Sequence, residues 1–220
     1  MNPFLTTLSL TQLGLHRLIH HYKLLISKQK AQRFILDSSE VFLELGSGSK
    51  KGSNGWCTLD LVEGCDLYWD LNKGLPYPSN SITKIYSSHV FEHFSFQEIQ
   101  KLLEECFRVL KPGGKILICV PDAEIFIRAY YENRELNHDI NIFVPAYSST
   151  GCKLDYVNYV AYCGGAHKYM FDRQNILSIL QLKGFEDAKL RDFDPMIDLE
   201  IRRAESLFVE ALKPIKNHFC

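Results

Sequence analysis

The chain has 220 residues, of which 46% are hydrophobic, 12% aromatic and 23% charged. This composition excludes an intrinsically disordered protein and predicts a single globular domain over residues 1–220. The 25 Lys and Arg side chains are balanced by 26 Asp and Glu side chains, and the resulting net charge of -1 argues against a nucleic-acid partner.

The seven cysteines are odd in number, widely spaced and without a C-x-x-C pair. This pattern favours free thiols in a reducing compartment over a disulfide framework or a zinc ribbon. No apolar run approaches the roughly 18 residues of a membrane-spanning helix, and the N-terminus lacks the pattern of a secretory signal. We therefore expect a cytoplasmic protein.

Residues 1–36 contain no acidic side chain but carry five Lys or Arg and three His side chains. Within residues 9–30, apolar side chains recur at spacings of three and four, which predicts one basic amphipathic helix. We expect this helix to act as a cap that covers sheet surface of its own domain. Peripheral contact with an anionic membrane, or a role as an import signal, is the open alternative. The side chains predicted to face inward are Leu15, Leu18, Tyr22 and Leu25.

From residue 41 the pattern changes to short apolar runs that end in Gly, Asp or Ser, as is typical of buried parallel strands. Helices are predicted at residues 96–110, where Ser95 and Glu98 suit a capping box, and at residues 172–183. This alternation predicts an α/β domain. The predicted strands cover residues 41–45, 56–59, 65–69, 82–86, 115–120 and 206–212.

A glycine-rich loop, Glu44-Leu-Gly46-Ser47-Gly48, follows the first predicted strand directly. Glycines at the carboxyl end of a parallel strand let the backbone approach a ligand. The loop is not a dinucleotide fingerprint, because the position of the last glycine is Lys51, and it is not a P-loop. The next two strands end in Asp60 and Asp70, which predicts two carboxylates facing one crevice, although either residue alone also suits an ordinary turn.

Taken in order, these motifs resemble those of the class I S-adenosylmethionine-dependent methyltransferases, in particular the methyltransferase type 11 group. The resemblance continues through residues 87–93, 108–114 and 184–185, and it covers residues 40–212. It implies a doubly wound, mostly parallel seven-stranded sheet of the Rossmann-like methyltransferase type. It also implies S-adenosyl-L-methionine as the cofactor.

The same resemblance implies a role for each residue of these motifs. The loop that begins at Glu44 would hold the methionine end of the cofactor, and Asp60 would bind the ribose. Asp70 and the Leu71 amide would bind the adenine, while the end of the fourth strand would close the site. The cofactor-binding residues implied in this way are Glu44, Gly46, Ser47, Gly48, Asp60, Leu61, Asp70, Leu71, Ser88 and His89.

The sequence departs from the family pattern at the third glycine of the loop, which is Lys50, and in the length of its early crossovers. Ten residues (46–55) separate the first two strands, and four (61–64) separate the next two. Because parallel crossovers usually need about a dozen residues, we expect shortened or absent helices and a partly uncovered sheet face. These departures keep a catalytically silent binding module with the same fold as an alternative function.

The run His89-Val-Phe-Glu92-His93 also spells the H-x-x-E-H pattern of an inverted zinc peptidase. That zinc site needs both histidines in one helix, whereas the preceding residues read as a strand, so a zinc peptidase is the remote alternative and no metal is expected. In the methyltransferase interpretation, Glu92 and His93 lie beside the methyl group as catalytic candidates. A Glu–His pair that only orders the loop is an equally good alternative.

Residues 128–170 are interpreted as an irregular insertion or lid on the substrate side. Their aromatic and polar composition suits a sugar or a small aromatic acceptor, although a packed lid core would have a similar composition. His167 follows two glycines that permit close approach of the backbone, and it is the third catalytic candidate. The predicted function is methyl transfer from S-adenosyl-L-methionine to a small-molecule or sugar-type acceptor. The identity of the acceptor, methylation at oxygen or nitrogen, and the oligomeric state are left open.

Overall fold

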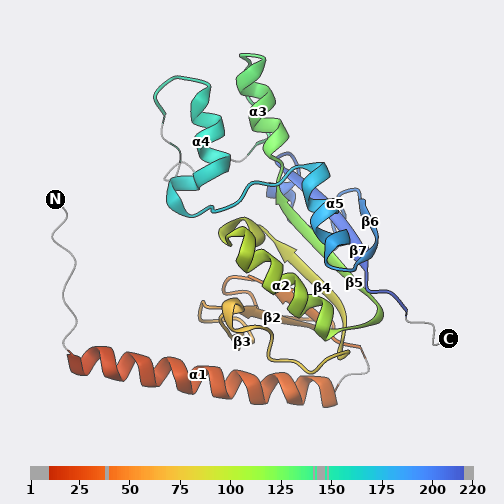
Figure 1. Cartoon of the computed structure of the whole chain (residues 1–220). Helices are drawn as coiled ribbons and strands as arrows, with labels where there is room; N and C mark the ends of the chain where they lie inside the picture. Colours follow the sequence, from red (N-terminus) through yellow and green to blue (C-terminus); the bar gives the residue numbers. More distant parts are fainter. Residues whose placement is uncertain (1–9, 38–39, 141, 143–146, 148, 216–220) are drawn as a thin grey trace.

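The computed structural model describes the chain except for residues 1–9, 38–39, 141, 143–146, 148 and 216–220. Its centre is a seven-stranded sheet in the order β3-β2-β1-β4-β5-β7-β6 (Figure 1). Strands β1 to β5 run parallel, and β7 runs antiparallel to both of its neighbours. This order confirms the predicted mostly parallel sheet. The strands are β1 (Phe42–Leu45), β2 (Trp56–Asp60), β3 (Leu67–Tyr68), β4 (Ile82–Ser88), β5 (Leu110–Pro121), β6 (Glu186–Leu190) and β7 (Ser206–Leu212).

Five α-helices accompany the sheet in the described part of the chain (Figure 1). The predicted capping box of α2 is present, because the Ser95 hydroxyl accepts from the Glu98 amide and the Glu98 carboxylate accepts from the Ser95 amide. Asp172 caps α5 in the same reciprocal way with Asn175. The helices are α1 (Leu10–Leu36), α2 (Phe96–Val109), α3 (Ala123–Tyr131), α4 (Leu154–Tyr162) and α5 (Arg173–Leu182).

The two faces of the sheet are covered differently. Helices α2 and α5 pack in one core with the face that carries Leu43 and Ile118. The opposite face carries Phe42 and Trp56, which are half-buried and whose rings lie 5.4 Å apart. No helix occurs in residues 46–55 or 61–66, all of which the structure describes, so the predicted loss of the early helices is confirmed.

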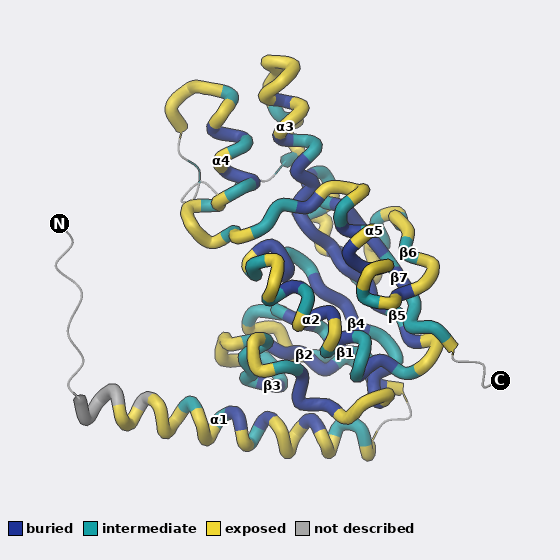
Figure 2. The backbone as a smooth tube through the Cα atoms, in the orientation of Figure 1, coloured by how far each residue is buried: buried dark blue, intermediate teal, exposed yellow. Residues whose placement is uncertain are grey.

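Helix α1 runs along the β3 edge of the sheet and buries Leu24, Ser27 and Ala31 (Figures 1 and 2). The prediction that four other side chains face inward is wrong. Periodicity finds an apolar face, but it cannot tell which of two faces the sheet will meet. Here the helix side that carries the small residues Ser27 and Ala31 allows α1 to approach the sheet edge closely. The exposed fractions of Leu15, Leu18, Tyr22 and Leu25 are 59%, 68%, 64% and 51%.

The region predicted to be irregular, residues 128–170, instead contains helix α4. This helix packs against α3 through a small separate core that includes Phe126, Tyr159 and Val160. The spacing of Tyr156, Tyr159 and Val160 is helical, but tyrosines are also common in strands and loops, so the sequence pattern was ambiguous. Figure 1 shows α3 and α4 standing together beyond one end of the sheet.

Candidate active site

A cavity of about 290 Å³ lies at the carboxyl ends of the first four strands, and we call it the strand-end cavity. Parallel strands deliver loop residues to this edge, which is where open α/β sheets bind their ligands. Its walls include six of the ten residues predicted to bind the cofactor. These six are Gly46, Asp60, Leu61, Asp70, Leu71 and His89.

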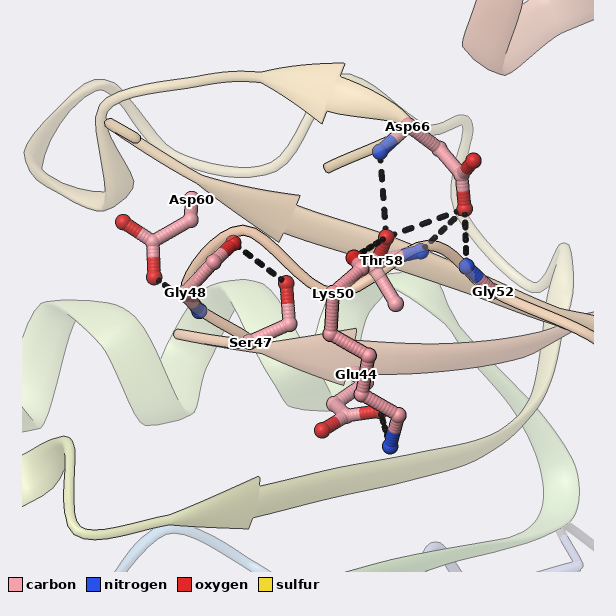
Figure 3. A network of polar contacts seen from close by, with 8 residues as sticks. All are labelled: Glu44, Ser47, Gly48, Lys50, Gly52, Thr58, Asp60 and Asp66. Atoms are coloured by element: carbon pink, nitrogen blue, oxygen red, sulfur yellow. Dashed lines mark hydrogen bonds and ion pairs between the residues drawn. The ribbon is translucent and has the colours of Figure 1, made fainter. Parts of the chain in front are cut away.

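Two backbone amides hold the Asp60 carboxylate in place. One carboxylate oxygen accepts from the Gly48 amide at 2.8 Å (Figure 3). The other accepts from the Val62 amide at 3.2 Å. Each carboxylate oxygen can accept further hydrogen bonds. Asp60 therefore keeps acceptor capacity for two hydroxyl groups of a ligand in the cavity.

The glycine loop depends on two glycines for different reasons. Both have positive φ angles, +66° at Gly46 and +61° at Gly48. A Cβ atom at Gly46 would lie 2.1 Å from the Val90 side chain, so a larger residue there cannot fit without movement. A Cβ atom at Gly48 would meet no described heavy atom within 4 Å. The loop thus offers open space beside Gly48, as a cofactor lying along the backbone requires.

The end of the cavity formed by Asp70 and Trp69, where the sequence analysis expects the adenine, is also preorganised. The Asp70 carboxylate accepts from the Asn72 amide at 3.0 Å and caps a 3-10 turn, Leu71–Lys73. The indole of Trp69 donates to the Gly74 carbonyl oxygen at 2.6 Å, which fixes the ring in the cavity wall. Together with Leu61 it provides the flat apolar surroundings that suit an adenine ring.

The loop that replaces the missing helix after β1 is held by Asp66, a residue that the sequence analysis did not single out. One Asp66 carboxylate oxygen accepts from the Gly52 amide at 2.9 Å, and from the Thr58 amide and hydroxyl, each at 3.0 Å (Figure 3). Its signal in the sequence was a carboxylate directly before a strand, which is too common to interpret alone. These bonds fix the loop without a helix.

Not every predicted residue reaches the cavity. Side chains alternate along a strand, and Glu44 therefore points to the sheet face opposite Leu43. Its carboxylate pairs with Lys50 at 2.8 Å (Figure 3) and lines a different cavity beside Trp56. Ser88 is the register partner of Cys119 on β5, and its buried hydroxyl has no hydrogen-bond partner among the described residues. The predicted residues outside the walls of the strand-end cavity are Glu44, Ser47, Gly48 and Ser88.

A second cavity of about 310 Å³ adjoins the first, and we call it the lid cavity because α4 forms one of its walls. His89 and His93 line both cavities, so the two spaces meet at these side chains. The polar side chains of the lid cavity come from the loop after β4, the turn after α4, and the segment before β7. They are His89, Glu92, His93, Cys163, His167, Arg202 and Glu205.

The three predicted catalytic residues converge in the lid cavity. One ligand atom from each of Glu92, His93 and His167 lies within 4.8 Å of the other two. The amide of Lys168 donates to the Glu92 carbonyl oxygen at 2.8 Å, which docks the distant segment onto the loop after β4. We call these three side chains the acceptor cluster.

Both histidines of the acceptor cluster have a defined tautomer. Nδ1 of His93 lies 3.0 Å from the Ala166 carbonyl oxygen, and Nδ1 of His167 lies 2.9 Å from the Val160 carbonyl oxygen. A carbonyl oxygen only accepts hydrogen bonds, so each Nδ1 carries the hydrogen. In the neutral ring, the lone pair is then on Nε2.

Burial shifts the pKa values of the titratable side chains in and around the acceptor cluster. Glu92 is 1% exposed, and burial raises the pKa of its carboxyl to about 8. Burial lowers the pKa of the neighbouring His89 to about 2, and its Nε2 lies 2.8 Å from the Ser206 hydroxyl. The His89 ring is therefore neutral and has a structural role. Burial also lowers the pKa of His167.

The H-x-x-E-H motif does not form a zinc-peptidase helix. β4 ends at Ser88, and a 3-10 turn covers only Phe91–His93. His89 has a positive φ of 53° and bonds to Ser206, so it does not share a helix face with His93. The remote zinc-peptidase alternative therefore lacks the structure it needs.

Residues 26–118 match the family model of the methyltransferase domain, whereas no curated protein sequence matches the chain. A SAM-dependent methyltransferase from Archaeoglobus fulgidus has a TM-score of 0.52 at 16% identity, covering 86% of this chain and 93% of that one. A chain of the Haloferax volcanii complex that contains the Trm112 methyltransferase activator has a TM-score of 0.51 at 14% identity, covering 92% and 97%.

An S-adenosylmethionine-dependent methyltransferase from Mesorhizobium loti has a TM-score of 0.50 at 18% identity, covering 82% of this chain and 96% of that one. At such identities the likeness shows the fold. The strand order and the glycine loop that opens onto the strand-end cavity agree with the family match. The chain therefore has the fold of S-adenosylmethionine-dependent methyltransferases, and its residues 26–118 match the model of the methyltransferase domain.

Proposed function

We propose that the enzyme transfers the methyl group of S-adenosyl-L-methionine to a hydroxyl group of a small, sugar-type acceptor in the lid cavity. The observation that carries this proposal is that the strand-end and lid cavities share His89 and His93 as walls. A cofactor in the first cavity then has its reactive end beside a ligand in the second. In-line attack requires this proximity.

On the cofactor side, we propose that Asp60 accepts hydrogen bonds from the ribose hydroxyls and that Asp70 and Leu71 contact the adenine. Gly46, Ser47 and Gly48 would lie along the methionine end. The cofactor supplies a methyl group on a positively charged sulfur. The free acceptor capacity of Asp60 and the open space at Gly48 support this placement.

On the acceptor side, we propose that the acceptor cluster holds the attacking hydroxyl and eases the loss of its proton. The Nε2 lone pairs of His93 and His167 suit a hydroxyl donor. The aromatic ring of Tyr159 and the paired charges of Arg202 and Glu205 also line the cavity. A ring face together with several hydrogen-bonding groups suits a sugar.

The test has two stages. Calorimetry with S-adenosyl-L-homocysteine, the demethylated cofactor, should show saturable binding of one molecule per chain. Thermal-shift screening of acceptors with that product present should then find a hydroxyl compound, since a ligand at about 100 times its Kd stabilises the fold by roughly 2.7 kcal/mol. Binding of the product without methylation of any acceptor would favour the catalytically silent module. That module is expected to have lost a cavity, whereas both cavities are present.

We also propose that α1 contacts the surface of an anionic membrane. Leu18 and Tyr22 lie nine positions before the buried Ser27 and Ala31, which is half a turn around the helix axis at 100° per residue. The exposed apolar stripe therefore faces away from the sheet. It comprises Leu15, Leu18, Ile19, Tyr22 and Leu25.

Charge favours a membrane over a second copy of the chain as the occupant of this stripe. Residues 1–36 have no acidic side chain, and Arg17, Lys28 and Lys30 are exposed along α1. Two such helices would repel each other, whereas anionic lipid headgroups would be attracted. No helix among the described residues has the length and apolarity to cross a membrane.

Flotation with vesicles tests this attachment. We expect binding to phosphatidylglycerol-containing vesicles and weaker binding to phosphatidylcholine alone. The double variant Leu18→Glu/Leu25→Glu should lose binding, while Leu182→Glu, which alters a leucine 79% exposed on α5, should keep it. Equal binding by all three proteins would contradict the proposal.

A further inference from the structure

Glu92 is a buried carboxylate that the described part of the protein leaves without a hydrogen-bond partner. It is 1% exposed, and no described atom hydrogen-bonds to either of its carboxylate oxygens. The nearest ring nitrogen, His89 Nδ1, lies 3.4 Å away without forming a hydrogen bond. A buried polar group without a partner is costly, so its retention calls for a ligand.

The two histidines beside Glu92 have the arrangement that metal-binding histidines usually show. Each donates its Nδ1 hydrogen to a backbone carbonyl oxygen, of Ala166 for His93 and of Val160 for His167. Such bonds fix the tautomer and the ring orientation, and they leave Nε2 as the ligand atom. The ring centroids lie 5.1 Å apart.

We propose that Glu92, His93 and His167 bind one divalent ion of the first transition series or zinc. The ligands would be a Glu92 carboxylate oxygen and the two Nε2 atoms. Two imidazoles and one carboxylate favour Zn²⁺, Fe²⁺ or Mn²⁺ over Ca²⁺ or Mg²⁺, which prefer all-oxygen sites. This proposal differs from the expectation in the sequence analysis that the protein binds no metal.

The three side chains lie close enough to form such a site if their ligand atoms move slightly toward one another. One ligand atom from each of the three residues now lies within 4.8 Å of the other two, whereas ligands about 2.1 Å from one ion lie about 3–4 Å apart. His93 is exposed and can make most of this movement. The nearby Arg202 charge is matched by Glu205, whose carboxylate lies 2.9 Å from the guanidinium.

The role of the ion rests on the proposed function, although its binding does not. Three protein ligands leave coordination positions open to an acceptor hydroxyl. With the ion bound, the two Nε2 lone pairs hold the ion in place of the hydroxyl. The ion then lowers the pKa of that hydroxyl, and the proton passes to solvent water. The oxygen then bonds to the methyl carbon as the sulfur–carbon bond breaks, giving a methyl ether and S-adenosyl-L-homocysteine.

Metal binding can be measured on the full chain without any acceptor. The protein is stripped with a chelator, titrated with Zn²⁺ by calorimetry, and analysed for bound metal after dialysis. We expect one ion per chain. His167→Ala and His93→Ala should weaken binding more than roughly a hundredfold, since loss of an outer-shell partner alone costs 10–100-fold. Substitution with Co²⁺ should give visible absorption bands that both variants lose.

His138→Ala is the matched control, because His138 is exposed and lies outside the acceptor cluster. It should bind the ion as the unmodified chain does. Substoichiometric metal in the unmodified chain, or full binding by the His93→Ala/His167→Ala double variant, would overturn the site. Melting curves of each variant show whether a loss of binding reflects a loss of fold.

The outcomes also separate this inference from the proposed function. If stoichiometric metal binds but no acceptor is methylated, the metal site stands and the proposed function fails. If methyl transfer proceeds at full rate in the chelated protein, the proposed function stands and the role of the ion is overturned.

Discussion

The strand-end and lid cavities touch, but they are built in different ways. The strand-end cavity is drawn from residues 46–94, and its loops follow consecutive parallel strands. The polar residues of the lid cavity come from residues 89–93, 163–167 and 202–205, which are far apart in the sequence. One cavity therefore depends on local turns at strand ends, and the other depends on long-range docking.

The two cavities also differ in how their polar groups are satisfied. In the strand-end cavity, Asp60 and Asp70 already accept hydrogen bonds from backbone amides. In the lid cavity, Glu92 has no hydrogen-bond partner among the described residues. The first is organised for binding before its ligand arrives. The second holds an uncompensated group, which is characteristic of a site of chemistry.

The largest expected effect separates chemistry from cofactor binding. His167→Ala should lower kcat about 10²–10⁴-fold, which is about 3–5 kcal/mol, because it removes one group that handles the acceptor proton. The Kd for S-adenosyl-L-homocysteine should stay within about twofold, since His167 lines the lid cavity and not the strand-end cavity. Single-turnover kinetics with the screened acceptor measures the first quantity and calorimetry the second. A parallel loss of cofactor affinity would mean that the two cavities are not separable.

The next effect tests the local geometry of the strand-end cavity. Gly46→Ala should lower the free energy of unfolding by about 2–4 kcal/mol, because positive φ and the Val90 contact both oppose a Cβ atom. Gly48→Ala is the matched control, with similar φ but open space, and should cost only about 1 kcal/mol. Urea denaturation measures both. Adding Val90→Ala should recover part of the Gly46→Ala loss, and no recovery would disprove the clash.

The third test addresses cofactor recognition. Asp60→Ala should weaken binding of S-adenosyl-L-homocysteine by about 1.5–3 kcal/mol through the loss of charge-assisted hydrogen bonds to the ribose. Glu63→Ala alters a nearby exposed carboxylate that pairs with Lys23, and it should leave the affinity unchanged. Isothermal calorimetry distinguishes the two. Equal weakening by both variants would point to general electrostatics rather than ribose binding.

The smallest effect asks how much the strand-end region depends on α1. Leu24→Ala should lower the free energy of unfolding by about 2 kcal/mol, because Leu24 is 8% exposed against the sheet edge. Leu18→Ala, at a residue 68% exposed, should change it by less than about 0.5 kcal/mol. Chemical denaturation checks both values. A larger loss of unfolding free energy for Leu18→Ala than for Leu24→Ala would support the helix orientation expected from the sequence.

Much of the fold could be predicted from the sequence, because many of its signals are local. The run Ser206–Leu212 was predicted with its observed bounds, and the capping box of Ser95 and Glu98 was predicted correctly. Strand β6 (Glu186–Leu190) was missed, since it is an edge strand with an exposed, charged sequence and no apolar alternation. Its pairing with β7 depends on backbone hydrogen bonds that no side-chain pattern reveals.

The candidate site shows the same division. Asp60, Asp70 and Gly46 could be placed because a residue at a strand end reaches the ligand edge of a parallel sheet. Glu44 could not, since one position along a strand turns its side chain to the other face. The tautomers of His93 and His167 depend on carbonyl groups more than five residues away along the chain or in another segment.

The sequence by itself determined the alternation of strands and helices, the glycine loop and the carboxylates at the strand ends, because these follow from local spacing and turn chemistry. The tertiary structure decided which side of α1 meets the sheet, because sheet contact favours small residues such as Ala31 over a longer apolar stripe. It also decided that Glu92 and His167 share one cavity. Docking of the Lys168 amide onto the Glu92 carbonyl oxygen joins segments that no local pattern connects.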